Sequence, residues 1–134
     1  MTRYLLDTNI VSDLVRHPRG RVASHVVRVD TANLCISIIV AAELRFGAVK
    51  RGSAQLAARI DAILRTLTVV PLESPTDQIF AEMRTGLERA GTTIGALDML
   101  IAAHALTLDC TIVTDNEREF ARVAGLRMEN WLRV

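Results

Sequence analysis

The stretch YLLDTNIVSDLV, residues 4–15, decides the fold of this chain. Its first residues form a short apolar run that ends at Asp7, and Asn9 then opens a pattern of helical spacing. The apolar positions of that pattern are Ile10, Val11, Leu14 and Val15. The stretch therefore predicts a strand, a turn and a helix.

Outward from this stretch, strand-like and helix-like segments alternate along the chain. Further strands are expected at residues 34–38, 68–72 and 111–114, with a possible edge strand at 126–128. Further helices are expected near residues 22–27, at about 40–50, up to about 67 from a cap at Ser53, and at 77–89, 96–108 and 117–122. Such alternation implies right-handed crossovers. We expect an α/β fold, a three-layer α/β/α sandwich with a mainly parallel central sheet.

Length and composition favour one domain over residues 1–134. Hydrophobic residues make up 50% of the chain and aromatic residues 4%, which predicts an aliphatic core. Cys35 and Cys110 lie in apolar runs and are expected to be buried thiols in a reducing compartment. No stretch resembles a signal peptide or a membrane span, so we expect a cytoplasmic protein without a membrane partner.

The net charge is +1, and Lys50 is the only lysine among 16 basic residues. Arginine has a planar fork of donors that suits phosphate, so the composition permits a nucleic-acid partner. A coding bias toward arginine on a solvated surface explains it as well. A nearly neutral protein must bind a polyanion through a local site.

Two aspartates follow predicted strands directly. Asp7 comes after the first strand and Asp115 after residues 111–114, so parallel strands bring both to the same edge of the sheet. In open α/β sheets that edge carries the site. The alternatives are a helix N-cap for Asp7 and a turn residue for Asp115.

Two more acids lie among apolar neighbours on predicted helices. Three and four positions away, Asp98 has residues such as Ile94 and Ile101, and Glu43 has Val40 and Phe46. A buried carboxylate must be paired, protonated or bound to a metal. The alternative to a metal is an arginine partner, for example Arg45 or Arg84.

Clustered carboxylates repel one another, and a divalent cation removes that repulsion. Ligands that are all oxygen indicate a hard cation, Mg2+ or Mn2+, rather than zinc. Such a cation lowers the pKa of a bound water and stabilises charge on a phosphoryl oxygen. This chemistry suits hydrolysis of phosphodiester bonds.

Several short motifs, in this order, resemble the PIN-domain nucleases, and most closely the VapC-type toxins of bacterial toxin–antitoxin pairs. They are the run from Leu5 to Asn9, Ala42-Glu43-Leu44, Ile94-Gly95 with Asp98, the run from Ile101 to Ala105, and Val113-Thr114-Asp115-Asn116. The similarity runs essentially from end to end, including the closing residues 126–131.

The resemblance implies a Mg2+- or Mn2+-dependent endoribonuclease that cuts an RNA of translation, such as tRNA or rRNA. It also implies a cognate VapB-type antitoxin and a homodimer. Position by position, the family's acidic quartet falls on Asp7, Glu43, Asp98 and Asp115. In some relatives a later glutamate shares the fourth role, so Glu119 is a reserve ligand; a solvated helix residue is the alternative that we favour for it.

Polar residues flank the acids and are candidates for supporting hydrogen bonds, with turn and capping duty as the alternative. They are Thr8, Asn9, Thr114 and Asn116. His104 is a candidate for a general base, but its spacing from Asp98 on the predicted helix directs its side chain away from that acid. We therefore expect His104 to pack in the core. A metal-bound water makes such a base unnecessary.

Basic residues near the expected helix ends are candidates for contacts with RNA phosphates, with solvated surface as the alternative for each. They are Arg16, Arg19, Arg21, Arg45, Lys50 and Arg51. The few aromatic residues favour recognition by phosphates and RNA shape over base stacking. Apolar helices at residues 22–27 and 60–67 supply a dimer interface, an antitoxin groove, or simply core.

Two other functions fit parts of the pattern. A phosphoaspartyl phosphatase also has an aspartate after its first strand, but it needs a second aspartate where Asn9 stands and a lysine near the site. A catalytically silent partner in a repressor complex is the other possibility, and the presence of all four acids argues against it.

Overall fold

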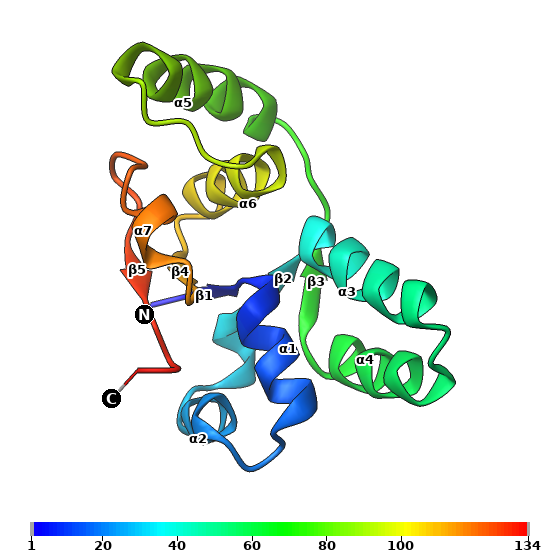
Figure 1. Ribbon diagram of the computed structural model, residues 1–134. Helices are drawn as coiled ribbons and strands as arrows, with labels where there is room; N and C mark the ends of the chain where they lie inside the picture. The colour runs from blue at the N-terminus through cyan, green and yellow to red at the C-terminus, as the bar shows by residue number, and fades with distance from the viewer. Residues whose placement is uncertain (1, 134) are drawn as a thin grey trace.

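A parallel five-stranded sheet organises the structure, a computed structural model that describes residues 2–133 (Figure 1). The strand order is β3-β2-β1-β4-β5, and every neighbouring pair is parallel. The strands are β1 (Tyr4–Leu6), β2 (Leu34–Ser37), β3 (Thr68–Val70), β4 (Thr111–Val113) and β5 (Met128–Glu129). The predicted parallel sheet is confirmed.

Helices lie on both sides of this sheet, as expected for three layers (Figure 1). They are α1 (Thr8–Arg16), α2 (Arg21–Arg28), the short 3-10 helix η1 (Thr31–Asn33), α3 (Ile38–Arg51), α4 (Ala54–Thr66), α5 (Thr76–Ala90), α6 (Ala96–Thr107) and α7 (Glu117–Phe120). Helices α5 and α6 pack against each other, and so do α3 and α4.

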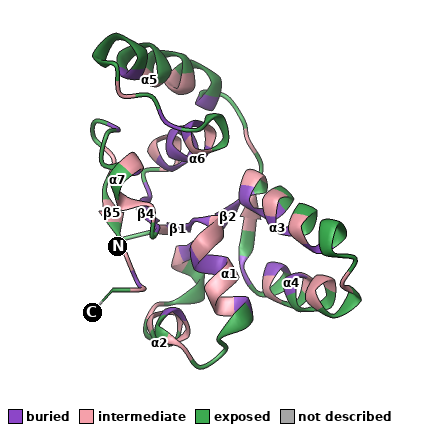
Figure 2. Cartoon of the chain, in the orientation of Figure 1, coloured by how far each residue is buried: buried purple, intermediate pink, exposed green. Residues whose placement is uncertain are grey.

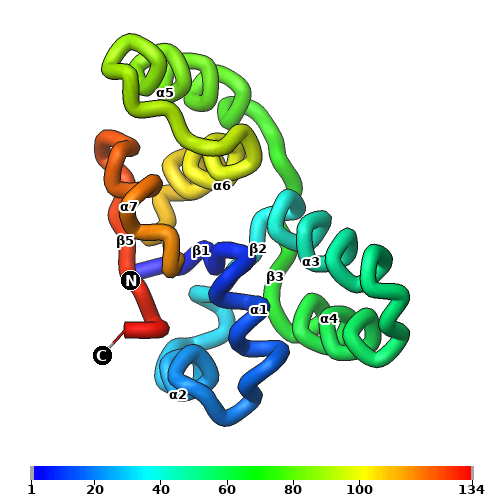
Figure 3. Tube along the Cα trace, in the orientation of Figure 1, coloured from blue at the N-terminus to red at the C-terminus, as the bar shows by residue number. Residues whose placement is uncertain are grey.

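The path of the chain reverses direction across the sheet at the central strand β1. The chain enters through the central strand β1, builds β2 and β3 on one side, and returns to build β4 and β5 on the other (Figure 3). The strand order therefore reverses between β1 and β4. In open parallel sheets, ligands bind beyond the carboxyl ends of the strands at such a reversal.

The core is aliphatic, as the composition predicts. The strands of the sheet carry fully buried residues such as Leu5, Ile36 and Ile112, and buried positions gather on the sheet and on the helix faces toward it (Figure 2). Cys35 and Cys110 are buried free thiols with their sulfur atoms 3.9 Å apart. No helix within residues 2–133 is long and apolar enough to cross a membrane.

Local capping explains where the helices differ from the sequence prediction. Helix α3 begins at Ile38, before the expected residue 40, because the Ser37 hydroxyl accepts a hydrogen bond from the Ile39 amide and caps it. Helices α3 and α5 end at Arg51 and Ala90, and each is followed by a capping glycine, Gly52 or Gly91, with a positive φ angle that glycine adopts readily.

The final segments are shorter or shifted relative to the prediction. Helix α7 stops at Phe120, two residues early, where the phenyl ring is buried in the core. The edge strand lies at Met128–Glu129 and not at residues 126–128, because its ladder pairs with Ile112 and Val113 of β4.

Candidate metal centre

Asp7 stands at the carboxyl end of β1 and is the N-cap of α1. Its side chain is buried, and one carboxylate oxygen accepts a 2.7 Å hydrogen bond from the Thr114 hydroxyl at the end of β4. The other accepts a 2.8 Å bond from the Thr8 amide. Burial raises the pKa of Asp7 although these donors act in the opposite direction. The capping alternative and the site interpretation are thus compatible.

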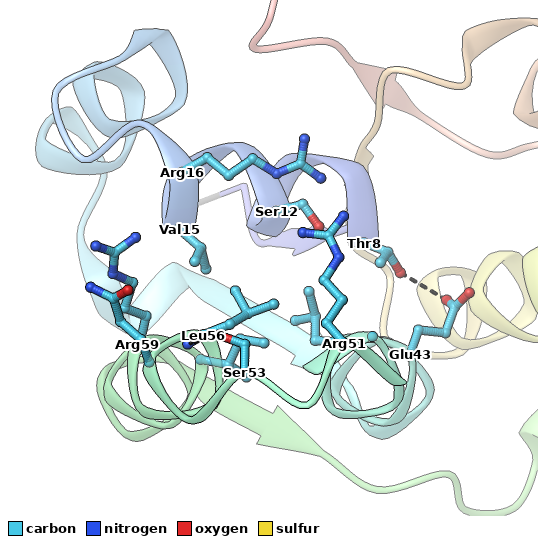
Figure 4. A pocket seen from close by; sticks show the side chains of 13 residues that line it. Thr8, Ser12, Val15, Arg16, Glu43, Arg51, Ser53, Leu56 and Arg59 are labelled. Carbon is cyan, nitrogen blue, oxygen red and sulfur yellow. Dashed lines mark hydrogen bonds between the residues drawn. The ribbon is translucent and has the colours of Figure 1, made fainter. Parts of the chain in front are cut away.

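Glu43 faces Asp7 from the first half of α3. Its side chain is half-buried, and its Oε1 accepts a 2.8 Å hydrogen bond from the Thr8 hydroxyl (Figure 4). Thr8 therefore contacts two acids, with its amide on Asp7 and its hydroxyl on Glu43. The Glu43 carboxylate also contributes to the raised pKa of Asp7.

Asp98 comes from the first turn of α6 and is half-buried. Its pKa is raised to about 6, first by burial and then by the negative charges of Asp7, Glu119 and Glu43. The Asn116 side chain donates a 3.4 Å hydrogen bond to it. Carboxylates from β1, α3 and α6, far apart in sequence, thus act on one another in space.

The two candidates for a fourth acid occupy different surroundings. Asp115 is exposed, and its carboxylate accepts a 2.9 Å hydrogen bond from Asn130. Glu119 is half-buried and shares the Asn116 amide with Asp98, at 3.2 Å. Glu119 contributes to the raised pKa of Asp98, and Asp115 is not among the causes. Glu119 is therefore not the fully solvated helix residue that the sequence favoured.

The polar residues predicted to support the acids form a connected network. The Asn9 side chain donates to Asp7 at 3.4 Å and accepts from the Asp115 amide at 3.1 Å. The Thr114 hydroxyl, which donates to Asp7, accepts from the Asn116 amide at 2.9 Å. These contacts fix the carboxylates before any ligand arrives.

The arginine alternative is not realised within residues 2–133. Arg45 pairs with Asp61 at 2.7 Å, and Arg84 pairs with Glu88 at 2.9 Å. None of the ion pairs in this part of the chain involves Asp7, Glu43, Asp98 or Glu119.

The acid cluster fits a hard divalent cation by its chemistry. The donors are carboxylate oxygens, the charges of neighbouring acids help to raise the pKa of Asp7 and of Asp98, and no acid of the cluster has a basic partner among the described residues. Within residues 2–133, no three acidic, histidine or cysteine side chains lie close enough together to coordinate one metal ion in their present positions. Closely placed carboxylates without a cation repel one another, so some separation is expected.

The basic candidates fall into two groups. Residues of the first group have partners within the chain. Arg45 forms an ion pair with Asp61, Arg21 donates to the Leu132 carbonyl at 3.1 Å, and the Lys50 ammonium lies 5.8 Å from the centre of the Phe46 ring. Arg19 is exposed beyond the end of α1. Arg16 and Arg51, by contrast, line a pocket that adjoins the acids.

This pocket has a volume of about 320 Å³ and lies between α1, α3 and α4 (Figure 4). Thr8 and Glu43 form the wall shared with the acid cluster. Ser12 and Arg59 also line it, and the sequence analysis did not select them. Their position shows only once α1 and α4 are packed side by side, since neither belongs to a motif.

Two further residues settle alternatives left open by the sequence. His104 is buried, and its Nδ1 lies 2.9 Å from the Ser37 hydroxyl, so it packs within the core, as expected. Lys50 lies at the far end of α3, seven residues beyond Glu43 and against Phe46. The structure thus gives the phosphatase hypothesis no lysine beside Asp7.

A model of the PIN domain matches residues 4–126 of the chain. The ribonuclease VapC2 of Rickettsia felis is 36% identical over 130 residues, covering 96% of this chain and 97% of the relative. The tRNA(fMet)-specific endonuclease VapC of Shigella flexneri is 32% identical over 132 residues, covering 98% and 99%.

Solved structures agree with this result. A VapBC2 complex of Rickettsia felis, bound to a promoter DNA fragment, contains a chain with a TM-score of 0.88 and 32% identity, over 97% of this chain and 99% of that one. A DNA-bound VapBC complex of Salmonella typhimurium gives 0.89 and 30%, over 98% and 99%. PIN-domain ribonucleases generally depend on a divalent metal. The chain therefore belongs to the PIN-domain family, within its group of VapC ribonucleases.

Proposed function

We propose that this protein is the toxin of a type II toxin–antitoxin pair and acts as a Mg2+- or Mn2+-dependent endoribonuclease. One observation carries the proposal. Asp7, Glu43 and Asp98 act on one another at the reversal of the sheet, and no basic side chain of residues 2–133 pairs with them. A hard cation is the partner that such a group lacks.

Each acid has a definable task in this proposal. Asp7 and Asp98 would hold the cation through carboxylates that accept hydrogen bonds from Thr114 and Asn116 respectively, and Thr8 donates a hydrogen bond to Glu43. A bound divalent cation supplies a nucleophilic water at neutral pH and neutralises charge that develops on the phosphoryl oxygens. His104 is buried and has no catalytic role in this proposal.

For the fourth acid we propose Glu119 ahead of Asp115. Glu119 shares a hydrogen-bond donor with Asp98 and raises the pKa of Asp98, whereas Asp115 is exposed and held by Asn130. In this proposal Asp115 positions Asn9, because the backbone amide of Asp115 donates a hydrogen bond to the Asn9 side chain. The proposed set therefore keeps Asp7, Glu43 and Asp98 from the sequence prediction and takes the reserve residue Glu119 in place of Asp115 as the fourth acid.

The proposed substrate is an RNA of translation, with tRNA first. The relatives in Shigella flexneri and Salmonella typhimurium are named tRNA(fMet)-specific endonucleases, at 32% and 30% identity over nearly the whole chain. Phosphate recognition by arginine rather than base stacking agrees with the 4% aromatic content. An RNA substrate also makes the cytoplasm the expected site of action.

The proposed partner is a VapB-type antitoxin, since the similar solved structures are VapBC complexes. We also propose a homodimer of single-domain chains. Ile60 and Leu64 are buried in the core, so the helix at residues 60–67 offers little to a partner. Helix α3 instead exposes Ile38, Phe46 and Val49, hereafter the α3 stripe, which gives a dimer an apolar surface.

The test is cleavage of purified tRNA by the purified protein. We expect cleavage with Mg2+ or Mn2+, none with EDTA, and recovery when metal is restored. Asp98→Asn should abolish it. Asp77→Asn is the matched control, because Asp77 occupies the first turn of α5 as Asp98 does that of α6, but is exposed. Equal activity of wild type and Asp98→Asn would refute the proposal, and an inactive wild type would favour the silent-partner alternative.

A further inference from the structure

The pocket beside the acids has a charged region that the proposed chemistry does not use. Three guanidinium groups line it, from Arg16, Arg51 and Arg59, against the single carboxylate of Glu43. None of these arginines has an ion pair or a side-chain hydrogen bond within residues 2–133. Arginines elsewhere in the chain, such as Arg45, do have acidic partners.

Two of these groups converge. Arg16 at the end of α1 and Arg51 at the end of α3 extend toward the same region of the pocket, beside the Ser12 hydroxyl (Figure 4). Arg59 stands at the other end. Like charges brought together without an acid between them are unfavourable unless an anion binds there. Two guanidinium forks and a hydroxyl match the oxygens of a phosphate.

The lining and the size of the pocket indicate what kind of molecule carries this anion. Its floor is aliphatic, from Leu44, Leu56 and Ile60, and no aromatic side chain lines it for a base to stack on. A volume of about 320 Å³ is at the small end of ligand sites, enough for one group of a longer molecule. The pocket also shares Glu43 and Thr8 with the acid cluster.

We propose that Arg16, Arg51 and Ser12 bind a backbone phosphate of the RNA substrate, next along the strand from the phosphodiester that is cut. This inference rests on the proposed ribonuclease function. The phosphate site fixes the register of the RNA, so that the neighbouring phosphodiester lies over Asp7, Glu43 and Asp98. Recognition at this point is of the backbone and is independent of base identity.

The test measures RNA binding in the Asp98→Asn background, where the strand stays intact. A fluorescent single-stranded RNA is titrated at several salt concentrations with Arg16→Gln, Arg51→Gln and, as matched control on α3, Arg45→Gln. We expect Arg16→Gln and Arg51→Gln each to weaken binding about tenfold, because a charge-assisted contact is lost. Each should reduce the slope of log K against log salt by about 0.7. Arg45→Gln should match the parent protein.

A second measurement uses wild-type background and short substrates. Cleavage of an RNA that carries a neutral methylphosphonate beside the cut bond should drop about as much as cleavage of normal RNA by Arg16→Gln, and the two changes together should cost little more. Unchanged salt slopes in both arginine variants, while the wild type still cuts RNA, would overturn the phosphate site and leave the nuclease standing. Weakened antitoxin binding with normal RNA binding would assign the pocket to the antitoxin instead and equally overturn it.

Discussion

Asp98→Asn should stabilise the metal-free protein at neutral pH although it destroys the site. The carboxyl of Asp98 has a pKa raised to about 6 by burial and by Asp7, Glu119 and Glu43. A raised pKa means that the folded protein holds the proton more tightly than the unfolded chain. The stabilising contribution is complete below the unfolded value of 3.8 and is lost as pH rises through about 6. Asparagine stays uncharged at every pH, so Asp98→Asn avoids this loss of stability at neutral pH.

The size of the effect follows from that pKa. Moving a carboxyl from 3.8 to about 6 costs the folded state at most about 3 kcal/mol at pH 7. Because Asp98 is half-exposed, solvent screens the repulsion, and we expect about 1 kcal/mol. For a chain of 134 residues this is a rise of about 4 °C in Tm.

The assay is thermal unfolding of wild type, Asp98→Asn and the control Asp77→Asn, in EDTA, at pH 7.5 and pH 4. The gain of Asp98→Asn should be present at pH 7.5 and nearly absent at pH 4. Saturating Mg2+ should reverse the order, because binding to the native state at 100 times Kd adds about 2.7 kcal/mol. A loss of stability that is equal at both pH values would refute the repulsion on which the metal centre depends.

Three further predictions concern the surroundings of the acids. Thr114→Val removes the donor to Asp7 and should weaken metal binding about 10- to 100-fold by calorimetry; unchanged affinity would contradict the orienting role. Burial lowers the pKa of His104, so its contribution to stability is complete above about pH 6.5 and is lost as pH falls. Urea midpoints of His104→Gln should therefore drop less than those of wild type between pH 7.5 and pH 5, and parallel drops would refute this. Phe46→Glu, in the α3 stripe, should leave a monomer in sedimentation, whereas an intact dimer would place the interface elsewhere.

The sequence predicted the fold well because alternation of apolar runs is a local property. The parallel sheet followed from strands separated by helices, and the prediction that β1 stops directly before Asp7 is confirmed. Asp98 and Glu43 were found because a carboxylate among apolar helical neighbours demands an explanation. Both do lie half-buried beside other acids.

Features that depend on packing between distant segments could not be predicted in the same way. Glu119 lies on a four-residue helix, too short for a periodic pattern, so its approach to Asp98 had no local sign. Ser12 and Arg59 meet only across the pocket between α1 and α4. Helix α2, one of the two helices predicted for a dimer, exposes Val27, whereas the exposed apolar side of α3, at Phe46, was not predicted, because periodicity does not say which apolar face the core takes.

The most direct test of the central claim is anomalous diffraction from crystals of the protein soaked in Mn2+. The account predicts a strong peak within about 2.0–2.3 Å of carboxylate oxygens of Asp7 and Asp98, with Glu43 or Glu119 turned toward it. The same peak should vanish in Asp98→Asn crystals. Absence of any peak among these acids at saturating Mn2+ in active protein, or a peak bound only by other residues, would contradict it.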